Sequence, residues 1–195
     1  MMSAIVLAAG LSTRMGGINK LLLPFKGKTV IVTVVEHLVN AGIEEIIVVT
    51  GNHAEQVKNL LKHLDVKIIY NEDFKKGMTS SIKKGVLGVR GNSYMICLGD
   101  MPFITNEEYL QIRTFFEKQR HLNDACICIP TYKNKKGNPV VFSSFFKSEI
   151  FKHTNMEGCK GIIAGNQQNV YKLEMKAANI LKDIDTADNY NKAVM

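Results

Sequence analysis

Apolar runs alternate with amphipathic stretches along the whole chain. Short apolar runs rich in Val, Ile and Leu predict strands, and stretches with helical spacing of apolar residues predict helices. The predicted strands are Ala4–Ala9, Ile46–Thr50, Lys67–Tyr70, Tyr94–Leu98, Ala125–Pro130, Pro139–Phe142 and Val170–Glu174. The predicted helices are Val30–Ala41, Ala54–Leu64, Ser80–Leu87, Asn106–Arg120, Ser144–His153 and a last one near Asp188–Val194.

This alternation predicts an α/β fold with three layers. Several strands are apolar on both faces, which is typical of a mostly parallel, twisted sheet with helices on both sides and right-handed crossovers. Gly42 is expected to end the first helix, and Thr105 to cap the helix that follows it. No internal repeat or linker divides the chain, so residues 1–195 are predicted to form one domain. In such sheets ligands bind beyond the carboxyl ends of the strands.

Composition narrows the class of protein. Hydrophobic residues make up 46% of the chain and charged residues 22%, as in ordinary globular proteins. The net charge of +7 is spread evenly apart from Lys133-Asn134-Lys135-Lys136, which favours an anionic small molecule over nucleic acid. No apolar stretch approaches the roughly 20 residues of a membrane span, and no signal peptide is evident. We therefore expect a cytoplasmic protein with neither a membrane nor a nucleic-acid partner.

The cysteines do not predict a metal centre. They lack any C-x-x-C spacing, and two of them alternate along one apolar strand. Buried free thiols in a reducing compartment are expected, with a redox or soft-metal role as the alternative. The four are Cys97, Cys126, Cys128 and Cys159.

The loop after the first strand carries the first candidate chemistry. Between Gly10 and Lys20 it combines glycines, hydroxyls and the cation Arg14. Glycines let successive backbone N–H groups converge on anionic oxygens, arginine can clamp a phosphate with two donors, and lysine adds a point charge. The loop is neither a Walker A motif nor G-x-G-x-x-G. On composition alone it is either a phosphate site or a flexible glycine loop with solvated cations.

Two later segments also follow strands. Asp100 stands at the carboxyl end of its strand and is either a metal ligand or a turn residue. Ser80 and Ser81 open a predicted helix, so they can cap it or face a ligand.

The first loop resembles the signature loop of nucleotidyltransferases of the molybdenum-cofactor class. That pattern is L-A-A-G-x-S-x-R-M-G followed by K-L-L, and it matches Leu7–Gly16 and Lys20–Leu22. The resemblance implies a Rossmann-like, GT-A-like fold and a loop that wraps a nucleoside triphosphate, with Arg14 and Lys20 on its phosphates. The nucleotide-binding residues that it implies are Leu7, Ala8, Ala9, Gly10, Ser12, Arg14, Gly16, Lys20, Ser80 and Ser81. Ala9 matches the L-A-A-G of the cytidylyltransferase branch, whereas guanylyltransferases have L-A-G-G, so CTP is favoured.

The same resemblance implies a magnesium site. Gly99-Asp100-Met101-Pro102 is similar to the family's L-G-D-x-P, in which the aspartate carries the metal and acts in catalysis. The segment from Asp183 to Asp188 resembles the closing D-[I/V]-D-T-P-x-D, with Ala187 in place of the proline. We expect Asp100 and Asp185 to hold Mg²⁺, with Asp183 as the alternative to Asp185.

Two segments concern the acceptor. Gly137–Phe142 resembles G-[H/N]-P-V-x-F, which places Asn138 and Pro139 on the acceptor side. Relatives often have G-D-x-G-[A/V]-R where this chain has Gly158–Ile163, and Cys159 and Ile163 depart from that pair of charges. Lys160 is a candidate for a partial replacement.

The resemblance implies transfer of CMP from CTP to the phosphate of molybdopterin, with release of pyrophosphate and delivery to a molybdenum hydroxylase. Alternatives within the class are GTP as donor, or a sugar or polyol phosphate as acceptor. Alternatives outside it are a non-catalytic accessory protein that hands the cofactor to an enzyme of the xanthine-dehydrogenase kind, and a regulatory nucleotide-binding module. The presence of Arg14, Lys20 and Asp100 favours an enzyme.

Overall fold

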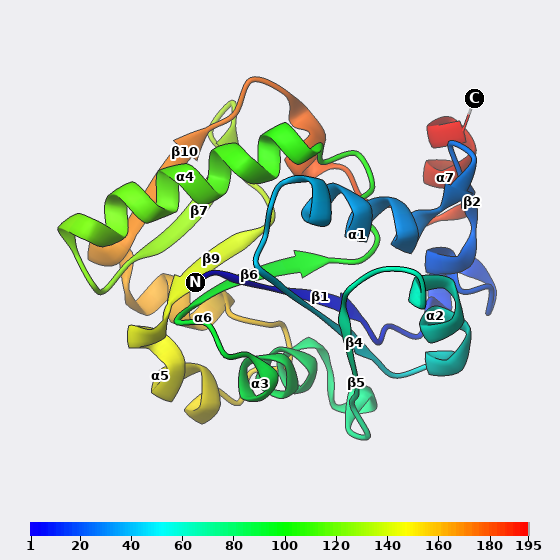
Figure 1. The fold of residues 1–195 in the computed structure, drawn as a ribbon, viewed down its shortest axis with the longest axis horizontal. Coiled ribbons are helices and arrows are strands. Elements are labelled where there is room, and N and C mark those ends of the chain that lie inside the picture. Colours follow the sequence, from blue (N-terminus) through cyan, green and yellow to red (C-terminus); the bar gives the residue numbers. More distant parts are fainter. Residues whose placement is uncertain (195) are drawn as a thin grey trace.

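The protein is built on one large mixed sheet, described by a computed structural model over residues 1–194. The order of strands across the sheet is β5-β4-β1-β6-β9-β7-β10, and β8 pairs with β7 (Figure 1). The strands of the sheet are β1 (Ser3–Ala8), β4 (Glu45–Thr50), β5 (Lys67–Tyr70), β6 (Ser93–Leu98), β7 (Ile127–Tyr132), β8 (Lys135–Lys136), β9 (Val140–Ser143) and β10 (Val170–Glu174). A separate small hairpin is formed by β2 (Pro24–Phe25) and β3 (Lys28–Thr29).

Most neighbouring strands run parallel, as predicted. The central strand β1 is parallel to both β4 and β6, and β10 is parallel to β7. The exceptions are β9, which is antiparallel to β6 and β7, and the short strand β8, which is antiparallel to β7. No helix lies between β7 and β9, and only a crossover connection lets consecutive neighbouring strands run parallel.

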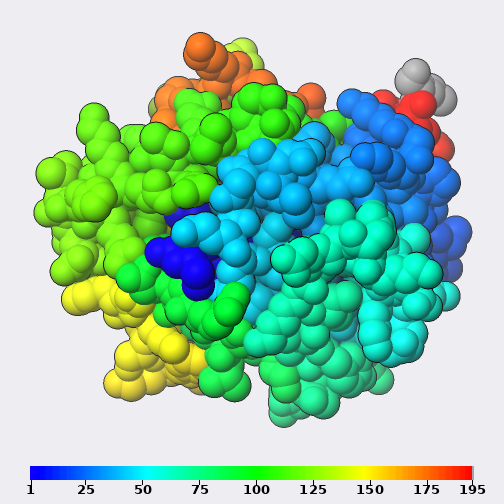
Figure 2. All heavy atoms as spheres, viewed as in Figure 1, coloured from blue at the N-terminus to red at the C-terminus, as the bar shows by residue number. Residues whose placement is uncertain are grey.

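Helices cover both faces of the sheet. They are α1 (Val30–Asn40), α2 (Ala54–Leu61), α3 (Met78–Gly88), α4 (Asn106–Leu122), α5 (Lys147–Lys152), α6 (Lys160–Gly165) and α7 (Ala187–Val194), among residues 1–194. Side chains of α1, α2 and α4 share one core with one face of the sheet, and those of α3, α5 and α6 share a second core with the other face. Figure 2 shows α1 and α4 in contact on the face of the sheet that they share.

Alternation along β1 divides the two cores. Ala4, Val6 and Ala8 belong to the core under α1 and α4, whereas Ile5 belongs to the core under α3. Residues of this sheet are apolar on both faces because helices cover both, which is what the uninterrupted apolar runs predicted. The three-layer prediction is confirmed.

The predicted helix ends are confirmed where the capping residues were clear. Thr105 and Glu108 form a reciprocal capping box at the start of α4. Gly42 follows α1 with a φ of 69°, the left-handed conformation that glycine adopts without strain. The predicted helix over 144–153 is instead a 3-10 turn at Ser144–Phe146 followed by α5.

The prediction of free cysteines is confirmed. Cys97, Cys126 and Cys128 are buried and Cys159 is half-buried, all four as free thiols. Burial raises the pKa of Cys126 to about 11 and that of Cys159 to about 12, and it raises the pKa values of the other two thiols as well. Across residues 1–194, no helix has the length and apolarity needed to cross a membrane.

Candidate active site

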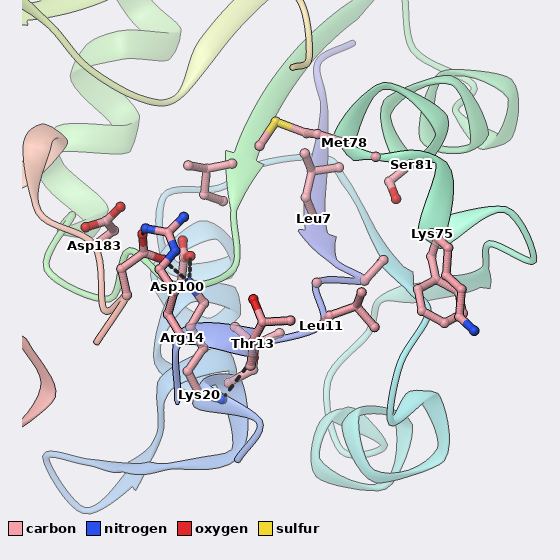
Figure 3. A pocket seen from close by; sticks show the side chains of 18 residues that line it. Leu7, Leu11, Thr13, Arg14, Lys20, Lys75, Met78, Ser81, Asp100 and Asp183 are labelled. Carbon is pink, nitrogen blue, oxygen red and sulfur yellow. Dashed lines mark hydrogen bonds and ion pairs between the residues drawn. The ribbon is translucent and has the colours of Figure 1, made fainter. Parts of the chain in front are cut away.

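A pocket of about 470 Å³ lies beyond the carboxyl ends of β1 and β6 (Figure 3). The loop after β1, the loop after β5, the start of α3 and the segment before α7 complete its wall. Its lining residues are Leu7, Ala9, Gly10, Leu11, Ser12, Thr13, Arg14, Lys20, Leu21, Phe74, Lys75, Gly77, Met78, Ser81, Leu98, Asp100, Asp183 and Asp185. The pocket occupies the side of the sheet on which ligands of α/β proteins bind.

The structure brings most of the predicted site residues to this one pocket. These are Leu7, Ala9, Gly10, Ser12, Arg14, Lys20, Ser81, Asp100 and Asp185, together with Asp183. Five others do not line it, namely Ala8, Gly16, Ser80, Asn138 and Pro139. The side chain of Ala8 lies in the core under α1, on the opposite face of β1 from Leu7. Gly16 ends the 3-10 turn over Thr13–Met15 with a φ of 62°.

The loop after β1 is held at three points. Met15 is buried and anchors the 3-10 turn, while Ser12 precedes that turn in a left-handed conformation. Asn19 is buried, and its side-chain oxygen accepts a hydrogen bond from the backbone N–H of Leu21. The backbone N–H of Lys20 donates to the hydroxyl of Ser12, at 3.4 Å. The loop therefore folds back on itself and carries Arg14 and Lys20 to the same side of the pocket.

Two cations and two carboxylates form a network at one end of the pocket. Lys20 Nζ contacts both Asp100 and Asp185, with 2.5 Å to Asp185 Oδ1. Arg14 Nη1 lies 2.5 Å from Asp185 Oδ2. The side chain of Lys20 is only 13% exposed, whereas that of Arg14 is 71% exposed. Lys20 is thus the fixed centre of the network, and Arg14 covers it from the solvent side.

Ionisation of the network follows from these contacts. Burial disfavours the charged form of Lys20, but Asp100 and then Asp185 outweigh it and raise the pKa of the ammonium group. Burial likewise opposes ionisation of Asp185, but Lys20 and Arg14 lower the pKa of that carboxyl. Partial burial, with the nearby charges of Asp185 and Asp100, raises the pKa of Asp183.

The acidic residues fit a magnesium ion that also binds phosphates. Oδ1 of Asp100 is buried and has no hydrogen-bond partner among residues 1–194, which leaves an oxygen for a further cation. Mg²⁺ in nucleotide sites takes one or two protein carboxylates and completes its shell with phosphate oxygens and water. Asp100 and Asp185 supply such a pair, although residues 1–194 hold no cluster of three or more His, Cys, Asp and Glu side chains arranged around a metal.

Backbone contacts place the two aspartates together. The N–H of Ile184 donates to the backbone oxygen of Asp100, at 2.9 Å, so the segment before α7 is tied to the loop after β6. Gly99 allows β6 to end close to β1, because a Cβ there would lie 2.9 Å from the backbone oxygen of Leu7.

The other end of the pocket is mostly apolar apart from Lys75. Leu7, Met78, Ser81 and Lys75 lie there, away from Arg14, Lys20, Asp100 and Asp183 (Figure 3). Phe74 closes this end and packs over Gly51 at the end of β4, where an added Cβ would come within 2.6 Å of the ring. The glycine is therefore required for the position of Phe74.

Phe74 and Lys75 line the pocket but were not among the predicted residues. They form part of the 3-10 turn Phe74–Lys76, which follows β5. Both residues follow a predicted strand, and that position could have indicated them, because ligands bind at the carboxyl ends of the strands.

Ser80, the neighbour of Ser81, is bound within its own loop. Its hydroxyl has two acceptors for its one proton, the backbone oxygens of Asp73 and Gly77, and it lies outside the pocket. Neither serine caps α3, because the helix begins after Gly77 without a side-chain cap.

The predicted acceptor segment contacts the 3-10 turn at Ala178–Leu181. The backbone N–H of Asn138 donates to Ile180, at 3.0 Å, and the Asn138–Pro139 peptide bond is cis. Cys159 is the N-cap residue of α6 and packs against the core under α3. The turn before α6 is joined to the start of α3, because Met78 N–H donates to the backbone oxygen of Met156 and Gly158 N–H donates to the hydroxyl of Thr79.

Comparisons with known proteins agree with this geometry. The model of the MobA-like NTP transferase domain matches residues 4–170. The molybdenum cofactor cytidylyltransferase of Escherichia coli K12 is 28% identical over 188 residues, covering 95% of this chain and 92% of the relative. A probable molybdenum cofactor guanylyltransferase of Methanosarcina mazei is 31% identical over 156 residues, covering 77% of this chain and 67% of the relative.

A solved structure shows the same fold. A nucleotidyl transferase from Methanothermobacter superposes with a TM-score of 0.86 at 24% identity, covering 100% of this chain and 96% of that one. The family model spans β1 to the start of β10, and it therefore includes the loop after β1, Asp100 and Ser81. This chain belongs to the family of MobA-like NTP transferase domains and is a nucleotidyltransferase.

Proposed function

We propose that this protein transfers CMP from CTP to the terminal phosphate of a molybdopterin-type acceptor and releases pyrophosphate. One observation carries the proposal: Lys20 and Arg14, from the loop after β1, meet Asp100 and Asp185 at one end of a nucleotide-sized pocket. Cations for a polyphosphate and carboxylates for its metal ion are thereby brought together. The similarity to a molybdenum cofactor cytidylyltransferase supports the acceptor and the product.

The reaction requires positioning more than acid–base catalysis. The attacking phosphate oxygen is already an anion, so it needs no strong general base, and pyrophosphate leaves from the α-phosphorus in line. The barrier is the repulsion between anions and the negative charge that grows on the leaving group. Fixed cations and N–H donors lower that barrier because they need no reorganisation during the reaction.

Each residue has a role in this proposal. Lys20 and Arg14 exchange their carboxylate partners for the triphosphate, and the backbone from Gly10 to Gly16 wraps it. Asp100 and Asp185 hold Mg²⁺, which supplies charge neutralisation to the polyphosphate when it is bound. The apolar end of the pocket receives the nucleoside.

Ala9 supports CTP as the donor. It lines the pocket directly after β1, at the position that distinguishes the L-A-A-G loop from L-A-G-G. The guanylyltransferase relative makes GTP the second candidate donor. A cytoplasmic location and delivery of the product to a molybdenum hydroxylase complete the proposal, and neither nucleic acid nor a membrane has a part in it.

The test is product formation with a panel of donors. The protein is incubated with molybdopterin, Mg²⁺ and each of the four ribonucleoside triphosphates, and mass spectrometry identifies the dinucleotide while pyrophosphate release is measured. We expect molybdopterin cytosine dinucleotide from CTP, and little product from the others. If only GTP gave product, GTP and not CTP would be the donor. Nucleotide binding without product from any donor, also with sugar and polyol phosphates as acceptors, would favour an accessory or regulatory protein.

A further inference from the structure

A second cavity, of about 640 Å³, lies between α2 and the carboxyl ends of β4 and β5. It is separate from the pocket beyond β1 and β6, the nucleotide pocket, because the two have no lining residue in common. Thr50, Gly51, Ile68 and Tyr70 line the second cavity on the side of the strands, and residues at the start of α2 line it on the other side. Its volume is typical of small-molecule sites, and the proposed nucleotidyl transfer gives it no role.

The strand side of the second cavity offers a flat apolar face. Tyr70 is 49% exposed, and β5, which carries it, is the edge strand of the sheet. Ile68 lies on the same face of β5, because side chains two residues apart point the same way along a strand, and it packs against the core under α1 and α4. A half-exposed aromatic ring next to a packed aliphatic side chain is a surface on which a planar ring can stack.

The helix side offers hydrogen-bonding groups of both kinds. Gln56 carries an amide with donors and an acceptor, Glu55 carries acceptors and Lys58 carries donors. The ion pairs found within residues 1–194 involve neither Glu55 nor Lys58, so both are open to a ligand. Their opposite charges balance, which favours an uncharged ligand with donors and acceptors over an anion.

Gly51 separates the second cavity from the nucleotide pocket. It lines the cavity, and a Cβ at this position would lie 2.6 Å from Phe74 and 3.0 Å from the Cβ of Ala9. Phe74 and Ala9 both line the nucleotide pocket. Because no free space lies between Gly51 and Phe74, a ligand that presses on Gly51 displaces the Phe74 ring and is not absorbed by the wall.

We propose that the second cavity binds an uncharged, planar nitrogen heterocycle, whose ring stacks on Tyr70 and whose polar edge meets Gln56. Binding there weakens CTP binding, because the displacement of Gly51 reaches Phe74. The site itself is independent of the proposed nucleotidyl transfer, whereas its effect on CTP rests on that function. Coupling between two sites is reciprocal, so CTP weakens binding of the heterocycle by the same factor.

The probe for the experiment is 2-aminopurine, an uncharged fluorescent heterocycle whose edge carries hydrogen-bond donors and acceptors. Its fluorescence is titrated with the wild type, Tyr70→Ala and Gln56→Ala. The matched controls are Tyr70→Phe, which keeps the ring, and Asn59→Ala, at an exposed amide of α2 that does not line the cavity. Thermal unfolding of each variant is recorded alongside.

We expect Tyr70→Ala to weaken 2-aminopurine binding about tenfold, the effect of one lost stacking contact. Gln56→Ala should weaken it about fivefold, the effect of one lost hydrogen bond. Both controls should bind the probe within about twofold of the wild type. All four variants should bind CTP as the wild type does when no 2-aminopurine is present, because none of the changed side chains lines the nucleotide pocket.

Titrations of the wild type with CTP and Mg²⁺ present distinguish a coupled site from a shared one. In a coupled site, CTP weakens 2-aminopurine binding only up to a limit, which we expect at about fivefold. Direct competition for one site would weaken it without limit as the CTP concentration rises. Tripolyphosphate, which lacks the nucleoside that Phe74 would meet, should leave 2-aminopurine binding unchanged.

The outcomes separate the site from its coupling. No binding of 2-aminopurine, or equal binding to the wild type and Tyr70→Ala, would overturn the site. Weakening without limit by CTP would place the probe in the nucleotide pocket instead. If bound CTP leaves 2-aminopurine binding unchanged or strengthens it, the coupling through Gly51 is wrong. If the wild type binds 2-aminopurine as expected but binds no CTP, the proposed function fails while the second site stands.

Discussion

Arg14 and Asp185 are separated by 171 residues in the sequence, yet their charged groups are 2.5 Å apart in the pocket. The contact joins the loop after the first strand to the segment before the last helix. Lys20, from the same loop, also contacts Asp185, and it contacts Asp100 as well. The cations proposed to bind phosphate are therefore paired with the carboxylates proposed to bind magnesium.

Removal of the Asp100 charge should strongly slow turnover without unfolding the protein. We expect Asp100→Asn to lower the rate of dinucleotide formation by about 10²–10³, a loss typical of removing one electrostatic contact to the transition state. Turnover is measured against Mg²⁺ concentration, with thermal unfolding as the check on folding. Asp188→Asn, at an exposed acidic residue of α7 outside the pocket, is the matched control. Near-normal activity of Asp100→Asn would contradict the metal assignment.

Lys20→Met should have opposite effects on the two kinds of ligand. It should weaken CTP binding, because a buried phosphate contact is lost. It should strengthen binding of Mn²⁺ without nucleotide, because Asp100 and Asp185 lose the cation that occupies them. Titrations followed by electron paramagnetic resonance measure free Mn²⁺, and Lys62→Met, at an exposed residue just after α2, serves as control. Weaker Mn²⁺ binding in Lys20→Met would show that the two cations do not compete.

Asp185 should contribute stability that depends on pH. Lys20 and Arg14 lower its pKa below the ordinary value of 3.8 in the folded protein. A lowered carboxyl pKa adds stability above the unfolded-state value, and that stability is lost as pH falls through the folded-state value. The side chain is 25% exposed, so we expect Asp185→Asn to cost about 1 kcal/mol at pH 6. Urea unfolding at pH 6 and pH 3 should show the difference shrinking at the lower pH; a constant difference would refute the linkage.

Gly51→Ala should disturb the nucleoside end of the pocket. The added methyl group would lie 2.6 Å from Phe74 and must displace that ring. Overpacking of this kind costs about 1–3 kcal/mol, and we expect it to lower the melting temperature and weaken CTP binding together. Gly165→Ala, where no atom lies within 4 Å of the added group, is the control. An unchanged affinity for CTP would mean that Phe74 does not shape the nucleotide site.

The thiols should resist modification while the protein is folded. Burial raises the pKa of all four cysteines, and the thiolate is the reactive form. We expect slow reaction with a disulfide reagent at pH 8, and rapid reaction of four thiols in concentrated guanidinium chloride. Rapid reaction of one thiol in the folded protein would instead support the redox alternative.

The strands of the large sheet were predictable because helices cover both faces, which produces uninterrupted apolar runs. α6 was not predicted because Lys160–Gly165 contains two glycines, which have low helix propensity. Packing of Ile162 and Ile163 against the core under α3 stabilises this helix. The direction of β9 follows from the missing helix before it.

For the site, sequence patterns indicated the loop after β1, Asp100 and the segment of Asp183 and Asp185, all of which the fold brings to one pocket. Which of two adjacent residues faces the pocket could be decided only from the structure. Alternation along β1 turns Ala8 into the core, and hydrogen bonds within its own loop hold Ser80 outside the pocket that Ser81 lines. The roles of Arg14, Lys20, Asp100 and Asp185 stay predictions until they are measured.

The tie between the first loop and the last segment also has a consequence for biosynthesis. On the ribosome, the amino-terminal part of a chain emerges first. A nascent chain that has released β1, its loop and Asp100 still lacks Asp185, the partner that Arg14 contacts in the finished protein. The network of Arg14, Lys20 and Asp185 can therefore reach its final form only after the segment that contains Asp185 has left the ribosome.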